Sequence, residues 1–150
     1  MDRYAQFTKD AIDSTLAREA YARYLQGLDW DFFFTVTFRN RFRDSIKAHE
    51  IVWETIAPHS ARAFLATERH RRPNLNCHVH GLVKVHRYGG TESGQLCATP
   101  TDLWRHLYGN HGRSRVEPVR SIEDVSAYCS KYVVKRLSDY GFYGRPKLWT

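Results

Sequence analysis

Residues 76–83, with the sequence NCHVHGLV, decide the fold of this chain. Two sets of side chains alternate along this stretch, and the period of two predicts a β-strand whose successive side chains point to opposite faces. His78 and His80 then lie on one face, about 6.5 Å apart along the strand. Two imidazoles in an otherwise apolar run need polar partners or a cation, because burying an unpaired polar group is costly. The stretch therefore predicts a strand that carries a metal site on one face.

Further strands are predicted on both sides of this stretch. Residues 29–39 are aromatic and β-branched throughout and indicate a buried central strand. Its exceptions are polar and share one face near the end of the strand: Thr35, Thr37 and Arg39. Residues 61–70 predict a strand that forms a hairpin with residues 77–86 across a turn-rich, basic connection. Residues 112–120 are expected to form a fourth strand.

Helices are predicted around these strands from amphipathic spacing and capping signals. They cover residues 3–27, 41–57, 100–108 and 122–137, and Gly27 is placed to end the first of them. Thr99 and Ser121 supply capping hydroxyls for the last two, each with an aspartate three residues later. The segment 87–98 is expected to be a loop, and the tail 138–150 is expected to be irregular or a short edge strand.

The resulting element order, αβαββαβα, predicts an α+β domain. We expect an antiparallel sheet in a split β-α-β arrangement, as in ferredoxin-like and RRM-like folds, with helices packed on the sheet. All 150 residues are expected to form one domain. It would consist of an N-terminal helix at about 3–27, a core at about 29–137 and the tail 138–150.

Composition points to a nucleic-acid partner inside the cell. The chain carries 23 lysines and arginines against 16 acidic residues, a net charge of +7, and 14% of its residues are aromatic. A basic domain of this size favours a polyanion, and aromatic rings are available for stacking on bases. Three cysteines without a C-x-x-C pair argue for a reducing compartment. Since no segment reads as a signal peptide or membrane span, we expect a soluble cytoplasmic protein.

A carboxylate is available to complete the metal site. In the predicted hairpin, Glu68 lies opposite His78 or His80 and joins both imidazoles, whereas a slip of one residue would turn it away. His70 shares that face and is the alternative ligand, and His86 lies about 20 Å further along the strand. Two imidazoles and one carboxylate leave positions open on an octahedral ion, which suits Mn²⁺ or Mg²⁺ acting on a phosphate. The cupin pattern also contains His-x-His, but it needs a glutamate closer behind the pair.

A second set of reactive side chains lies on the predicted helix 122–137. Four residues recur at three- and four-residue spacing and share one helix face: Tyr128, Lys131, Tyr132 and Lys135. A neighbouring stripe is apolar and is expected to face the core: Ile122, Val125, Cys129 and Val133. The tyrosines are therefore predicted to lie away from the core, with half-buried packing residues as the alternative. A phenol near a divalent ion and lysines can lose its proton and attack phosphorus, with Lys131 holding the phosphate or stabilising the phenolate.

Three blocks in this order resemble the HUH endonucleases, and among them the rolling-circle replication initiators of plasmids, phages and circular single-stranded DNA viruses. Residues 33–38, FFTVTF, resemble the first block, a structural strand. Residues 78–80, HVH, resemble the metal-binding histidine block, with Glu68 in the place of the upstream acidic ligand. Residues 128–131, YCSK, are similar to the Tyr-x-x-Lys nucleophile block. The resemblance covers roughly residues 30–137.

The resemblance implies a sequence-specific nickase and strand transferase that starts rolling-circle replication on single-stranded origin DNA. A tyrosine would stay bound to the 5′-phosphate and release a free 3′-OH, while Mn²⁺ or Mg²⁺ polarises the scissile phosphate. Viral initiators place a single nucleophile at Tyr128, phage-type initiators use Tyr128 and Tyr132, and some plasmid initiators attack with the second position. We expect Tyr128, with Tyr132 as its partner. The resemblance also implies a separate helicase, a monomer or weak dimer, and the prokaryotic cytoplasm or nucleoid.

Two other functions stay open. A single-tyrosine HUH transposase or a relaxase-like nickase would also carry a tyrosine on a helix, but the FTVTF strand and Lys131 favour an initiator. A non-catalytic RRM-like module would stack single strands on its sheet without cutting them. Basic residues near the predicted site are candidate contacts to the DNA backbone, with a solvated basic surface as the alternative. They are Arg39, Arg69, Arg71, Arg72 and Lys135.

Overall fold

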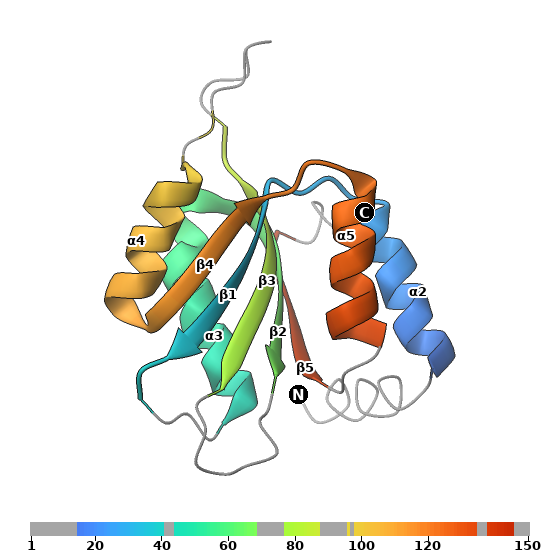
Figure 1. Cartoon of the computed structure of the whole chain (residues 1–150), viewed down its shortest axis with the longest axis horizontal. Helices are drawn as coiled ribbons and strands as arrows, with labels where there is room; N and C mark the ends of the chain where they lie inside the picture. Colours follow the sequence, from blue (N-terminus) through green and yellow to red (C-terminus); the bar gives the residue numbers. More distant parts are fainter. Residues whose placement is uncertain are drawn as a thin grey trace. The chain divides into compact units, whose positions relative to one another are not determined.

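The computed structural model describes residues 15–40, 44–68, 77–87, 96, 98–134 and 138–145. Its helices are α2 (Thr15–Gln26), α3 (Ser45–Ile56), α4 (Pro100–Asn110) and α5 (Ile122–Cys129), with the 3₁₀ turn η1 (Ala57–His59) and the π-helical segment η2 (Ser130–Val134). Its strands are β1 (Phe32–Phe38), β2 (Ser60–Glu68), β3 (His78–Val85), β4 (Gly112–Pro118) and β5 (Ser138–Gly144) (Figure 1). The chain divides into two compact units. We call them the sheet unit (Trp30–Val119 with Asp139–Thr150) and the helical unit (Met1–Asp29 with Arg120–Ser138).

The sheet unit is built on a five-stranded open sheet in the order β4-β1-β3-β2-β5. β1 pairs antiparallel with both β3 and β4, and β2 pairs antiparallel with β3. The connections β1-α3-β2 and β3-α4-β4 each pass over an intervening strand, which gives the split β-α-β arrangement. The predicted α+β class with an antiparallel sheet is confirmed. The tail supplies β5, the short edge strand that was one of its two predicted forms.

One face of this sheet forms the hydrophobic core with α3 and α4 (Figure 1). Every second residue of β1 is buried, beginning at Phe32, and the residues between them are half-buried. The sheet contributes Phe32, Phe34, Val36, Phe38, Ala63, Leu65, Val79, Val83 and Val85, and the helices contribute Ala48, Val52, Ile56, Leu103 and Leu107. β1 is therefore an interior strand, as predicted. Its other face carries Phe33, Thr35 and Thr37 and is not part of this core.

The predicted capping signals form at the starts of α4 and α5. Thr99 and Asp102 make a capping box, in which the Asp102 amide donates to the Thr99 hydroxyl (3.2 Å) and the Thr99 amide donates to the Asp102 carboxylate (2.9 Å). The bonds from Thr99 lower the pKa of the Asp102 carboxyl. At α5, the Asp124 amide donates to Ser121 (3.3 Å), but the Asp124 carboxylate accepts from the Arg120 amide (2.9 Å). The second cap is therefore only half of the predicted box.

Other predicted boundaries are close to those in the structure. α2 ends at Gln26, directly before the predicted stop at Gly27. α3 begins after Asp44, whose carboxylate accepts from the amides of Ile46 and Lys47. Parts of several predicted segments lie outside the described residues: 3–14, 41–43, 69–76, 88–95, 97, 135–137 and 146–150. None of the helices in the described part of the chain has the length and apolar character needed to cross a membrane.

The last predicted helix changes type along its length. α5 ends at Cys129 and the chain continues as the π-helical segment Ser130–Val134, whereas the sequence predicted a regular helix over residues 122–137. A π turn closes its hydrogen bond one residue later than an α turn, so it shifts the phase of all residues that follow. The prediction of one continuous α-helical face is therefore wrong beyond Cys129.

Gly81 allows β3 to run through the core directly beside the histidines. It stands opposite Phe34 of β1 and Leu65 of β2. A Cβ atom at this position would lie 2.4 Å from Phe34 Cζ and 2.7 Å from Leu65 Cδ2. Both neighbours are fully buried in a close-packed interior and have little room to move away. The packing of the three central strands therefore requires glycine here.

We expect Gly81→Ala to lower the free energy of unfolding by about 1 to 3 kcal/mol, because the added methyl group overpacks the core. Gly109→Ala is the matched control. Nothing lies within 4 Å of a Cβ atom at that position in α4, and alanine is the better helix former. Urea unfolding followed by circular dichroism measures both variants. A Gly81→Ala protein as stable as the wild type would contradict this packing.

His49 of α3 is buried against β5. It is 3% exposed, its Nδ1 lies 2.5 Å from the Tyr143 hydroxyl, and its Nε2 has no hydrogen-bond partner among the described residues. Trp53, one helical turn later, stacks on the Tyr143 ring. Burial lowers the pKa of His49 to about 4, although the Asp139 and Asp44 carboxylates act in the opposite direction. The imidazole is therefore neutral in the folded protein near neutral pH.

Stability should rise with pH between about 4 and 6.5, because in this range the unfolded chain binds a proton at His49 that the folded chain does not bind. The contribution is at most about 3 kcal/mol. We expect His49→Gln to lose this part of the pH dependence. His86→Gln, which changes an exposed histidine, should keep it. Urea unfolding at a series of pH values measures the slope, and an unchanged slope in His49→Gln would assign the effect to other groups.

Candidate metal centre and nucleophile helix

Three strands bring the predicted ligands together on one face of the sheet. Glu68 of β2 and Thr37 of β1 both stand directly opposite His78 of β3, and Thr35 stands opposite His80. Directly opposite residues of antiparallel strands point to the same face. The predicted register, with Glu68 opposite one of the two histidines, is therefore confirmed. This polar face is the reverse of the one that packs on α3 and α4.

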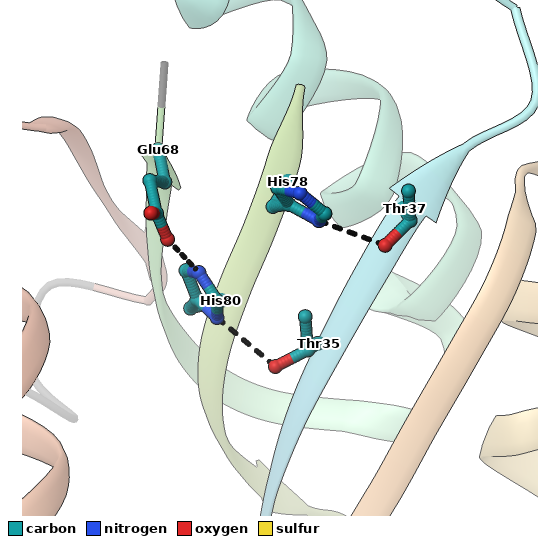
Figure 2. Close-up of polar contacts among 5 residues, drawn as sticks. All are labelled: Thr35, Thr37, Glu68, His78 and His80. Carbon is teal, nitrogen blue, oxygen red and sulfur yellow. Dashed lines mark hydrogen bonds and ion pairs between the residues drawn. The ribbon is translucent and has the colours of Figure 1, made fainter. Parts of the chain in front are cut away.

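His80 is held from both sides (Figure 2). Its Nε2 lies 2.7 Å from the Glu68 carboxylate, and its Nδ1 lies 3.0 Å from the Thr35 hydroxyl. A carboxylate only accepts hydrogen bonds, so the Nε2–H group donates to Glu68 and, in the neutral ring, Nδ1 accepts from Thr35. The side chains of His80 and Glu68 are only 6% and 15% exposed, so water cannot easily replace these partners. Both contacts are therefore needed to offset the burial of the ring.

His78 is held through the same type of contact. Its Nδ1 lies 2.8 Å from the Thr37 hydroxyl, and its ring is tilted by 24° from the ring of His80, with 6.3 Å between the centroids. Figure 2 shows the two threonines of β1 on one side of the histidines and Glu68 on the other. The predicted spacing of the imidazoles is confirmed. The polar residues Thr35 and Thr37 orient both rings through Nδ1.

The donor set fits a divalent cation in its chemistry, with Nε2 as the binding nitrogen of each ring. A partner on the other ring nitrogen commonly orients metal-binding imidazoles, and the two threonine hydroxyls supply it here. Among the described residues, no group of three or more His, Cys, Asp or Glu side chains is arranged to hold an ion. The Glu68 carboxylate bonds directly to His80 Nε2, the nitrogen that would bind the ion. Mn²⁺ or Mg²⁺ therefore stays a prediction.

The threonine hydroxyls suit both tautomers of these rings, because a hydroxyl can donate and accept. With a proton on Nε2, the Nδ1 atom of His80 accepts from Thr35. When Nε2 is used to bind a cation, the proton moves to Nδ1, which then donates to the same hydroxyl. The heavy atoms of His80 and Thr35 can therefore keep their positions while the tautomer changes.

The tyrosine block belongs to the helical unit, whereas the candidate ligands belong to the sheet unit. Tyr128 is 5% exposed and lies on the buried side of α5 with Val125 and Cys129, so the prediction that it faces away from the core is wrong. Tyr128 follows Val125 by three residues and so belongs to the same helical stripe, and its ring has a large apolar surface to bury. Ile122, predicted to face the core, is 68% exposed, because side chains tilt toward the helix N-terminus and it lies in the first turn.

The predicted partners of Tyr128 are separated from it by the change of helix type. Lys131 is exposed in the π-helical segment, whereas Tyr128 is buried in α5. The side chain of Tyr132 and all of Lys135 lie outside the described residues. Cys129 is not a competing nucleophile, because burial raises the pKa of its thiol to about 12. The meeting of a tyrosine with the histidine face stays a prediction.

Arg39, a predicted DNA contact, has a structural function at the end of α4. Its guanidinium donates to the carbonyls of Tyr108 and Gly109 and lies 5.6 Å from the centroid of the Tyr108 ring. A cation at the last carbonyls of a helix stabilises that end. The other arginines predicted to contact DNA lie outside the described residues: Arg69, Arg71 and Arg72.

Two arginines of β4, which the sequence analysis missed, lie on the histidine face of the sheet. Arg113 stands opposite Thr37 and Arg115 stands opposite Thr35, and both are exposed. The alternation in residues 112–118 places them on a common face, and this signal is present in the sequence. The sequence does not show which strand β4 pairs with, because that pairing joins distant parts of the chain. The structure was therefore needed to place these arginines near the histidines.

No known protein-family model matches this chain, and no curated protein matches its sequence. The resemblance to HUH endonucleases therefore depends on the three sequence blocks.

We expect Thr35→Val combined with Thr37→Val to weaken Mn²⁺ binding by about 10- to 100-fold, because the imidazoles lose the contacts that orient them. Thr55→Val is the matched control. Thr55 Oγ1 lies 2.7 Å from His111 Nε2, so this variant loses the same kind of bond elsewhere in the sheet unit. Isothermal titration calorimetry with manganese chloride measures the affinity. Undiminished binding by the double variant, or an equal loss in Thr55→Val, would show that the threonines do not prepare the site.

Proposed function

We propose that this chain is an HUH-type endonuclease that nicks and rejoins single-stranded DNA at a replication origin and so initiates rolling-circle replication. The observation that carries the proposal is the face formed by His78, His80 and Glu68, with both imidazoles held at Nδ1 by threonine hydroxyls. A largely buried imidazole–carboxylate pair is costly to maintain in a sheet, and such groups concentrate at functional sites. The net charge of +7 supports a polyanionic substrate.

Each group has a defined task in the proposed reaction. His78, His80 and Glu68 would hold a divalent ion, Mn²⁺ or Mg²⁺, and its charge would polarise the scissile phosphate. The tyrosine oxygen gives its proton to water and attacks phosphorus, which forms the phosphotyrosine bond and breaks the bond to the 3′ oxygen. The 3′ oxygen takes up a proton from water and leaves as a hydroxyl. Lys131 binds the phosphate or stabilises the phenolate, and rejoining is the reverse reaction.

Tyr128 is the proposed nucleophile, with Tyr132 as its partner. Their block includes the π-helical segment Ser130–Val134, and π turns within helices occur frequently at functional sites. Because Tyr128 is buried, its phenol has to become accessible before it can attack. Variants of each tyrosine are therefore needed to show which of them is the nucleophile.

The proposed activity requires a single-stranded substrate. A separate helicase or an extruded origin hairpin would supply it, and the protein would act as a monomer or weak dimer in the prokaryotic cytoplasm or nucleoid. A transposase or relaxase-like nickase would use the same groups and differ in the DNA site that it recognises. A non-catalytic single-strand binder is the second candidate, because RRM modules are built on a four-stranded sheet and four of the five strands here, β1 to β4, are joined in a split β-α-β arrangement.

We expect the wild-type protein to form a covalent adduct with labelled single-stranded DNA in the presence of Mn²⁺, visible as a shifted band on a denaturing protein gel. Tyr128→Phe should abolish the band if Tyr128 acts alone. If the two tyrosines are interchangeable, the band should persist in Tyr128→Phe and Tyr132→Phe and disappear only in the double variant. Tyr108→Phe, which changes an exposed tyrosine of α4, is the control that should keep the adduct.

Metal dependence separates the two candidate functions. A nuclease of this type should lose the adduct when EDTA removes the ion, and it should also lose it in His78→Ala. A binding module would retain single strands in EDTA and form no adduct with any oligonucleotide in a randomised library. That second outcome would falsify the nuclease proposal.

A further inference from the structure

The edge strand β4 carries a pair of arginines in line with the candidate metal centre. Residues that stand opposite one another across β4, β1, β3 and β2 form continuous rows on one face of the sheet. The first row is Arg113, Thr37, His78 and Glu68, and the second row is Arg115, Thr35, His80 and Ala66. Each histidine therefore has one arginine in its own row, two strands away.

The distance between each arginine and its histidine suits one ligand that contacts both residues of a row. Neighbouring strands lie about 4.8 Å apart, so the Cα atom of each arginine is about 10 Å from that of its histidine. An extended arginine side chain covers more than half of this distance. Along β4, Arg113 and Arg115 are about 6.7 Å apart, which is comparable with the separation of neighbouring phosphates in a stretched single strand. A DNA backbone that follows β4 could therefore place one phosphate at each arginine.

The charge and exposure of the pair also suit phosphate. Both arginines are exposed, and the side chain of Arg115 is 79% exposed while it forms an ion pair with Glu117. A guanidinium binds phosphate oxygens in a bidentate manner, and contacts of this kind position a strand without reading its sequence. Exposed charges on an edge strand can also serve only to prevent edge-to-edge pairing. That explanation does not account for the alignment of both arginines with both histidines.

We propose that Arg113 and Arg115 bind consecutive phosphates of single-stranded DNA and so position the scissile phosphate at His78 and His80. This inference rests on the proposed function, because it assigns the strand that the nuclease would cut. The DNA backbone runs along β4 at the open edge of the sheet. Arg113 and Arg115 are positioning residues, and Glu117 limits the charge of Arg115 by pairing with it.

The test is the salt dependence of binding to a fluorescein-labelled thymidylate oligonucleotide of about 20 nucleotides, measured by anisotropy in EDTA. The slope of log Kobs against log salt should fall by about 0.7 for Arg113→Gln and for Arg115→Gln, and by about 1.4 for the double variant. Glu117→Gln should tighten binding, because it releases Arg115 from its ion pair. Arg105→Gln is the matched control, since Arg105 is exposed on α4, which packs on the opposite face of the sheet.

Three outcomes overturn the proposal: an unchanged slope in the double variant, an equal loss in Arg105→Gln, or no binding of the oligonucleotide by the wild-type protein. Thermal unfolding of each variant verifies that it is folded. The adduct assay separates this inference from the proposed function. An adduct in the wild type with unchanged slopes in the arginine variants would remove the inference alone. Reduced slopes without any adduct would keep the DNA surface and remove the nuclease.

Discussion

The imidazole of His80 is largely buried, and its two ring nitrogens take their partners from two different strands. Glu68 of β2 holds Nε2 and Thr35 of β1 holds Nδ1. A slip of one residue in either strand pair would break the contact, because it turns the partner to the other face. The hydrogen-bonding requirement of one side chain thus favours this alignment of the three central strands over any alignment shifted by one residue. The same alignment places His78 against Thr37.

The two faces of β3 have different environments along the same eight residues. Val79 and Val83 pack into the core, and Gly81 between them makes room for the ring of Phe34. On the reverse face, His78 and His80 are held by side chains instead of by apolar packing. A site works best when rigid elements support it, and the close-packed core behind β3 supplies that support. The ligand geometry therefore depends on apolar contacts that do not touch the ligands.

Much of this arrangement could be predicted from local patterns. The alternation around His78 and His80 and the turn-rich connection predicted the strands of the hairpin and the register of Glu68. The capping residues predicted where α4 and α5 begin. Two features could not be predicted in this way. The pairing of β4 with β1, which brings Arg113 and Arg115 beside the histidines, joins segments far apart in the chain. The π-helical segment after Cys129 changes the helical phase, and a periodicity argument assumes that the phase is constant.

The central strands also bear on the choice between a nuclease and a passive binder. RRM modules stack bases on aromatic side chains presented by their sheet. On the polar face here, β1 presents Phe33, Thr35 and Thr37, and β3 presents imidazoles and Leu82. Phe64, on the same face of β2, is fully buried and packs against the rings of Tyr140 and Phe142. The hydroxyls of β1 and the largely buried His80 of β3 therefore stand where a stacking module needs exposed rings. The two imidazoles and the Glu68 carboxylate are ligands that a divalent cation accepts, and the proposed phosphate chemistry uses such a cation.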